Sequence, residues 1–105
     1  MANMFTQLKK AAQMRMKMSK IQKEMARITV EAKSGEVTAI VSCDMMLRSV
    51  KWLPGAFDPA RPERFEKMVV AAVNSALEDA KKRAAEEMAK MSGGLGGLAE
   101  MLSGQ

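Results

Sequence analysis

The chain of 105 residues contains no histidine and no tyrosine, and it has a single cysteine. Without histidine and a second cysteine, the usual zinc ligand sets and cysteine–histidine nucleophile pairs are excluded. A phosphate-binding glycine loop is also absent, because the glycine-rich run SGGLGG follows a predicted helix and carries no P-loop lysine. These absences predict a protein that is not an enzyme and that has no metal, no cofactor and no small-molecule substrate.

Long apolar runs are absent as well. The sequence has no stretch of about 18 apolar residues and no charged-then-apolar leader, so we expect a soluble cytoplasmic protein. The lone Cys43 cannot form an internal disulfide, so the fold should not depend on an oxidising compartment. A chain of this length suits one small domain with a modest core, and association between copies would help to cover its apolar surface.

Positive charge is concentrated at the N-terminal end. The formal net charge of the chain is +5, and residues 1–27 hold seven basic residues and one acidic residue, Glu24. Residues 28–62 and 63–91 are each neutral, and the remaining residues carry one charge, Glu100. An excess confined to one element is typical of a surface that meets a polyanion. The seven basic residues are Lys9, Lys10, Arg15, Lys17, Lys20, Lys23 and Arg27.

The same 27 residues read as one long helix. Apolar residues recur in steps of three and four from Met4 to Ile28, which predicts a stripe that packs along its length. Asn3 is a suitable N-cap. At 100° per residue, Lys10 and Lys17 flank the side opposite the stripe. The basic residues on that opposite side are Lys9, Lys20, Lys23 and Arg27.

After residue 27 the hydrophobic period changes to two. Alternating patterns near 28–33 and 37–42 flank the turn signal Ser34-Gly35, and a third strand is expected from Leu47 to Leu53. Short connections favour antiparallel neighbours, so we predict a three-stranded antiparallel meander. Ile40 makes the second face of its strand partly apolar, which suggests cover on both sides.

A second long helix is expected after the loop 54–57. Asp58-Pro59 is a good N-cap and N1 pair, and the helix should run to about Met91. Its charged residues are spaced for favourable i,i+4 ion pairs. We predict a single α+β domain over 1–91 in the order α-β-β-β-α, followed by a flexible glycine-rich tail over 92–105. The expected pairs are Glu63–Lys67, Glu78–Lys82, Asp79–Arg83 and Glu86–Lys90.

With its elements in this order, the chain resembles the YbaB/EbfC family of bacterial nucleoid-associated proteins. The order of elements matches, and so do the runs LKKAAQM, ITVEA with its Ser-Gly turn, and VVAAVNSALEDAKKRAAEEM. The terminal Met-Ser-Gly-Gly-Leu also fits, so the resemblance covers roughly residues 4–95. Two features depart from the family pattern. Cys43-Asp44-Met45-Met46 replaces a glycine-containing turn, so a wider or bulged hairpin is expected, and Trp52 replaces a smaller aliphatic residue.

The resemblance implies an intertwined homodimer with a shared sheet and helices that project like the arms of a tweezer. It also implies binding to double-stranded DNA with low sequence preference, nucleoid association, and a contribution to nucleoid organisation and gene regulation. The resemblance further implies that the DNA contacts lie on the outer helices. This points to Lys9, Lys10, Arg15, Lys17, Lys20, Lys23 and Arg27, with Lys81, Lys82 and Arg83 as weaker candidates.

The residues themselves fit this reading, because lysines that neutralise phosphates release condensed counterions without special geometry. A helix-turn-helix pattern is absent, and lysine is a poorer bidentate base reader than arginine, so weak specificity is expected. The competing readings are a basic amphipathic membrane-surface helix, which we do not favour, and a protein-interaction scaffold. Binding of single-stranded nucleic acid would need exposed aromatic residues on which bases can stack, and this chain has too few of them.

Three residues leave their roles open. Cys43 is read as a small residue at a strand end rather than a redox group. Trp52 is read as interface packing rather than a stacking platform. Asn74 lies beside the apolar arc of the second helix, where it is either a solvent-facing amide or a device that fixes the register of a dimer.

Overall fold

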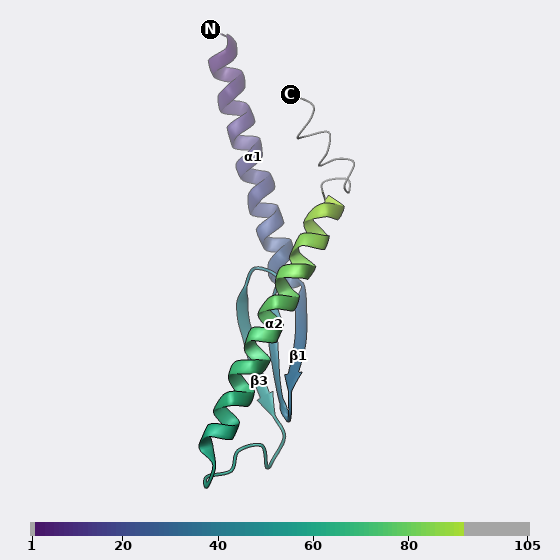
Figure 1. Cartoon of the computed structure of the whole chain (residues 1–105). Coiled ribbons are helices and arrows are strands. Elements are labelled where there is room, and N and C mark those ends of the chain that lie inside the picture. Colours follow the sequence, from purple (N-terminus) through teal and green to yellow (C-terminus); the bar gives the residue numbers. More distant parts are fainter. Residues whose placement is uncertain (1, 92–105) are drawn as a thin grey trace.

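The computed structural model describes residues 2–91 (Figure 1). The elements follow in the predicted order α-β-β-β-α, which confirms the α+β class. The predicted tail, residues 92–105, lies outside the described part. The elements are α1 (Ala2–Arg27), β1 (Thr29–Ser34), β2 (Val37–Ser42), β3 (Met46–Trp52) and α2 (Pro62–Met91).

The sheet is an antiparallel meander with the strand order β1-β2-β3, as predicted. The β1–β2 hairpin closes through Gly35-Glu36, with Ser34 paired to Val37. Gly35 has a φ of 58°, which favours glycine at the first central position of a tight hairpin. A Cβ atom at this position would lie 2.5 Å from the sulfur of Met68. The glycine therefore lets the hairpin turn and lets α2 approach it.

The β2–β3 hairpin is wider, as its sequence predicts. Its turn holds three residues and ends with Met45 at a φ of 65°, and the pairing of β2 with β3 shifts register between Ile40 and Val41. Ser42 Oγ donates a hydrogen bond to Asp44 Oδ1 and accepts one from Arg48 Nε at 2.9 Å. Arg48 Nη2 also donates to Asp44 Oδ2 at 3.0 Å. This triad of side chains holds the turn without a glycine.

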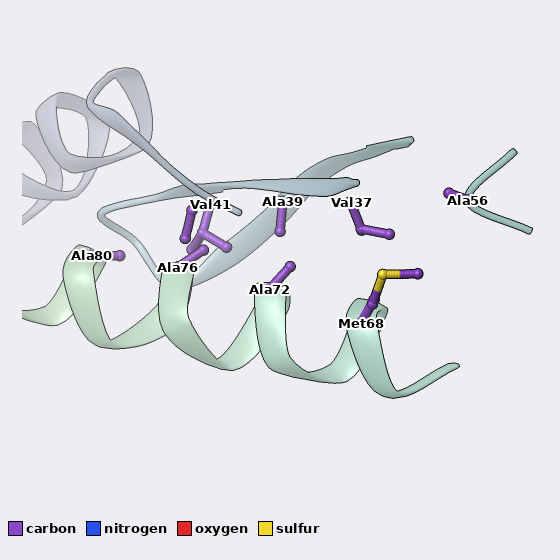
Figure 2. Close-up of a cluster of buried hydrophobic side chains, with 9 residues drawn as sticks. Val37, Ala39, Val41, Ala56, Met68, Ala72, Ala76 and Ala80 are labelled. Carbon is purple, nitrogen blue, oxygen red and sulfur yellow. The ribbon is translucent and has the colours of Figure 1, made fainter. Parts of the chain in front are cut away.

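The core lies between α2 and the sheet (Figure 2). On β2, the predicted inward residues Val37, Ala39 and Val41 have no exposed surface. They face a stripe on α2 at steps of four, in which three residues are alanine, so helix and sheet approach closely. Ala72, Ala76 and Ala80 have no exposed surface either, and Met68 ends the stripe beside Ala56.

The start of α2 differs from the prediction. The helix begins at Pro62 rather than at Asp58-Pro59. Asp58 instead caps a turn, because its Oδ1 accepts the Ala60 N–H at 2.9 Å and its carbonyl accepts the Arg61 N–H at 2.9 Å. Pro62 disfavours helical geometry in the residue before it and is well suited to the first helical position. The second proline therefore sets the boundary.

Helix α1 projects from the rest of the chain (Figure 1). It begins at Ala2, so the predicted cap Asn3 lies within the first turn. Within one chain the predicted stripe is buried at its sheet end, at Met25, and Ile21 is half-buried. Further out, Leu8 and Met14 are each 67% exposed. The described chain measures 72 × 25 × 18 Å, and this length reflects the projecting helix.

Enlarging the α2 stripe should loosen the fold. We expect Ala76→Leu to lower the free energy of unfolding by about 1–3 kcal/mol, because added methylenes have no space under the helix. Ala71→Leu places the same side chain on an exposed position of α2 and should change stability by less than about 0.5 kcal/mol. Urea denaturation measures both. Equal effects of the two substitutions would contradict the close packing.

The pKa of Asp44 provides a test of the hydrogen bonds that hold the β2–β3 turn. The hydrogen bond from Ser42, supported by the charge of Arg48, lowers the pKa of Asp44 below its ordinary 3.8. A lowered pKa means that the bond stabilises the fold above the unfolded pKa and that this contribution is lost as the pH falls through the folded pKa. We expect Ser42→Ala to raise the pKa of Asp44 in an NMR titration, and an unchanged pKa would refute the assignment.

Candidate nucleic-acid interface

The seven basic side chains of α1 are all exposed to solvent. Among residues 2–91, one ion pair involves them, between Arg27 Nη1 and Glu24 Oε1 at 3.7 Å. The Arg27 side chain in this pair is still 78% exposed, and surface pairs of this kind hold the two groups weakly. The positive charge predicted for this helix is therefore available to a ligand rather than neutralised by other residues in the described part of the chain.

The position of α1 makes that charge reachable. The helix has 26 residues, which is about 39 Å at 1.5 Å per residue. It contacts the rest of the described chain near its C-terminal end and is open on its sides beyond that point (Figure 1). The result is a rod with cationic side chains spaced along it, a shape that suits contacts to successive phosphates.

Two of the lysines lie beside the end of α2. Lys17 and Lys20 line a groove of about 460 Å³ together with Ile21, Glu24 and Met91. The side of α1 that faces α2 therefore also carries positive charge, although the helical wheel placed Lys20 on the side opposite the stripe. The structure brings Lys17 and Lys20 together here, and it leaves Lys9, Lys10 and Arg15 further out along the helix.

The basic residues of α2 have a different setting. Lys81, Lys82 and Arg83 are exposed, but Arg83 Nε pairs with Glu87 Oε1 at 3.0 Å and lowers the pKa of that carboxyl group through this hydrogen bond. Lys90 Nζ joins the same carboxylate at 3.6 Å. Glu87 thus takes the partners predicted for Asp79 and Glu86, and none of the four predicted i,i+4 pairs forms among residues 2–91. Helix α2 remains neutral overall.

A second groove, of about 510 Å³, lies between α1, α2 and the β2–β3 turn. Its wall includes Cys43, which is buried after the end of β2. Burial raises the pKa of the Cys43 thiol, so the group stays protonated and unreactive at neutral pH. This supports the structural reading of the cysteine. The methionines that line the groove are Met18, Met25, Met45, Met46 and Met88.

An apolar surface around β3 was not predicted from the sequence. Helix α2 packs mainly on β1 and β2, so β3 is left largely uncovered. Trp52 is 53% exposed and makes an edge contact with Phe65, with ring centroids 5.3 Å apart. A period-two pattern marks the inward side of a strand, but it does not tell which strand lies under the helix. The exposed apolar residues here are Met46, Leu47, Trp52, Leu53 and Phe57.

Within the described residues, no helix is long and apolar enough to cross a membrane. In the same part of the chain, no three histidine, cysteine, aspartate or glutamate side chains gather to hold a metal ion. Asn74 is exposed, so within one chain its amide faces solvent.

Comparison with known proteins gives a consistent result. The model of the YbaB/EbfC DNA-binding family matches residues 1–95. A nucleoid-associated protein of Thermoanaerobacter sp. (strain X514) is 39% identical over 95 residues, which are 89% of this chain and 86% of that protein. A nucleoid-associated protein of Granulibacter bethesdensis is 37% identical over 97 residues, covering 90% and 91% of the two chains. One from Lactococcus lactis is 35% identical over 97 residues, covering 90% and 98%.

Proposed function

The chain belongs to the YbaB/EbfC DNA-binding family, and from this premise we propose that it binds double-stranded DNA through the basic side chains of α1. The observation that carries the proposal is the open, unneutralised charge of the projecting helix. Lys9, Lys10, Arg15, Lys17, Lys20, Lys23 and Arg27 contact phosphates. Lys81 and Lys82 add weaker contacts, and Arg83 contributes least because Glu87 holds it.

We propose that this binding depends little on DNA sequence. Five of the seven basic residues on α1 are lysines, whose ammonium groups act as point charges and do not form a bidentate fork to guanine. Phosphate contacts position a protein on the duplex without reading bases. Such binding would place the protein at the nucleoid, as the names of its relatives indicate for those proteins, and would let it organise DNA and affect gene expression.

We further propose that residues 1–91 form one unit that pairs with a second copy through the apolar surface around β3. Five large apolar side chains on or next to β3 are about half exposed or more, and exposed apolar patches mark association sites. Strand β3 is also a sheet edge with free backbone groups, so a partner there would extend the sheet into a shared one. Two copies would present two α1 helices to one duplex.

The DNA-binding proposal predicts a strong salt dependence. If about four phosphates are neutralised, the logarithm of the affinity falls against the logarithm of salt concentration with a slope near −3.6, which is about 150-fold between 50 and 200 mM. We expect a variant with Lys9, Lys20, Lys23 and Arg27 changed to Gln to bind more weakly and with a shallower slope, since each lost contact removes about 0.9 from the slope. Mobility-shift titrations at both salt concentrations measure this.

The matched control is Lys81→Gln with Lys82→Gln, which removes two exposed lysines from the neutral helix α2 and should have a smaller effect per residue. Unchanged circular dichroism confirms that each variant is folded. Normal binding by the quadruple variant, or salt-independent binding by the parent, would contradict the proposal. Strong binding to anionic vesicles with none to DNA would favour the membrane-surface reading instead.

The dimer proposal predicts a light-scattering mass near twice the 11.5 kDa of the chain at concentrations below micromolar. Leu47→Lys with Leu53→Lys places charge on the β3 surface and should shift the mass to that of one chain. Both leucines are about half exposed or more within one chain, at 48% and 62%, so the monomer should tolerate the change. Leu8→Lys on α1, at a site 67% exposed, is the control. A dimer broken by the control and not by the β3 variant would refute this interface.

A further inference from the structure

The apolar stripe of α1 is left without cover where α2 ends. Near the end of α2, Met88 lines one groove together with the stripe residues Met18 and Met25, and Met91 lines a neighbouring groove with Ile21, so α2 ends beside α1 at this level. Beyond that level nothing in the described chain lies on the stripe, and Met14 and Met18 are 67% and 59% exposed. An exposed apolar stripe of this kind marks a site where another segment or another molecule packs.

We propose that this occupant is the chain's own C-terminal segment, with residues 95–102 packed against the α1 stripe from Met18 towards Leu8. The first support is position. The segment leaves α2 at Met91, which lines the groove beside α1, and the C-terminal end of α2 lies at the same end of the molecule as the projecting part of α1 (Figure 1). The described part of α2 therefore ends at the level of α1 from which the exposed part of the stripe continues.

The sequence of the segment supplies the second support. Leu95, Leu98 and Leu102 are spaced by three and four residues, the same spacing as the α1 stripe, so they can present one apolar side to it. Ser92-Gly93-Gly94 precedes them, and glycine permits the change of direction that the end of a helix requires. The apolar residues that α2 leaves uncovered on α1 are thus matched by apolar residues that immediately follow α2.

Charge and reach agree with this placement. Glu100 is the one charged residue of 92–105, and it is acidic, whereas the edges of the α1 stripe carry Lys10 and Lys17. The stripe from Met18 to Leu8 is about 15 Å long at 1.5 Å per residue. Residues 92–102 can span about 36 Å when extended, so the segment reaches without strain. Docking would cover the apolar side of α1 and leave Lys9, Lys23 and Arg27 open, so this contact does not rest on DNA binding.

A crosslinking pair tests the proposal. In a Cys43→Ala background, the variant Met14→Cys with Leu98→Cys should form a disulfide within one chain, because docking brings the two residues within the 4.4–6.8 Å that separates bridged Cα atoms. The matched control is Met16→Cys with Leu98→Cys. Met16 is also exposed, at 74%, but lies about 160° away around the helix from Met14. We expect the Met14 pair to close at least about tenfold faster, since docking raises the local concentration of the two thiols.

Non-reducing electrophoresis separates the outcomes. Equal rates for the two pairs would mean that the segment moves freely, as the sequence alone predicts, and would overturn the proposal. Disulfides that join two chains would assign the stripe to a second copy and would overturn it as well.

A second measurement avoids introduced cysteines. In the native chain, Leu98→Ser with Leu102→Ser should speed hydrogen–deuterium exchange of the α1 amides over residues 8–18, while the amides over 68–80 stay unchanged. Unchanged exchange over 8–18 would contradict docking even if the cysteine variants failed to fold.

Discussion

The structure depends on the close contact between α2 and the first two strands. Three alanines on one side of α2 meet Val37, Ala39 and Val41 on β2, and none of these residues retains exposed surface. Small side chains let the helix backbone come near the sheet, and Gly35 extends the same contact to the hairpin by leaving space for Met68. Because α2 and one face of the sheet bury each other's apolar side chains, α1 takes almost no part in the core.

This division of labour accounts for the site. A helix needed for the core must bury a side, but α1 buries mainly Met25 and can carry a net charge that would destabilise a compact domain. The neutral helix α2 supports the fold, and the basic helix α1 presents charge away from it. The same division leaves two apolar surfaces open in a single chain, one around β3 and one along α1. These are the surfaces that we assign to a second copy and to the C-terminal segment.

Much of this fold could be predicted from the sequence because its patterns are local. The alternation around Ser34-Gly35 located β1 and β2, and the departure at Cys43–Met46 predicted the wider turn that Met45 adopts. The predicted start of α2 was wrong because two helix-start signals lie close together there. The helix begins at Pro62, and Asp58 caps the turn before it. The predicted ion pairs of α2 were wrong because the spacing permits several partners for each charge. Glu87, whose side chain is 16% exposed, pairs with both Arg83 and Lys90. The exposure of Trp52 depends on where α2 crosses the sheet, which no local pattern records.

For the site, the charge of α1 was evident from the sequence, whereas the proximity of Lys17 and Lys20 to Met91 required the structure. The central claim is that DNA meets the cationic side chains of α1. Acetylation footprinting tests it directly, by comparing lysine reactivity with and without a duplex by mass spectrometry. DNA should protect Lys9, Lys17, Lys20 and Lys23 and leave Lys33, Lys51 and Lys67 unchanged. Protection of the second set without the first would contradict the account.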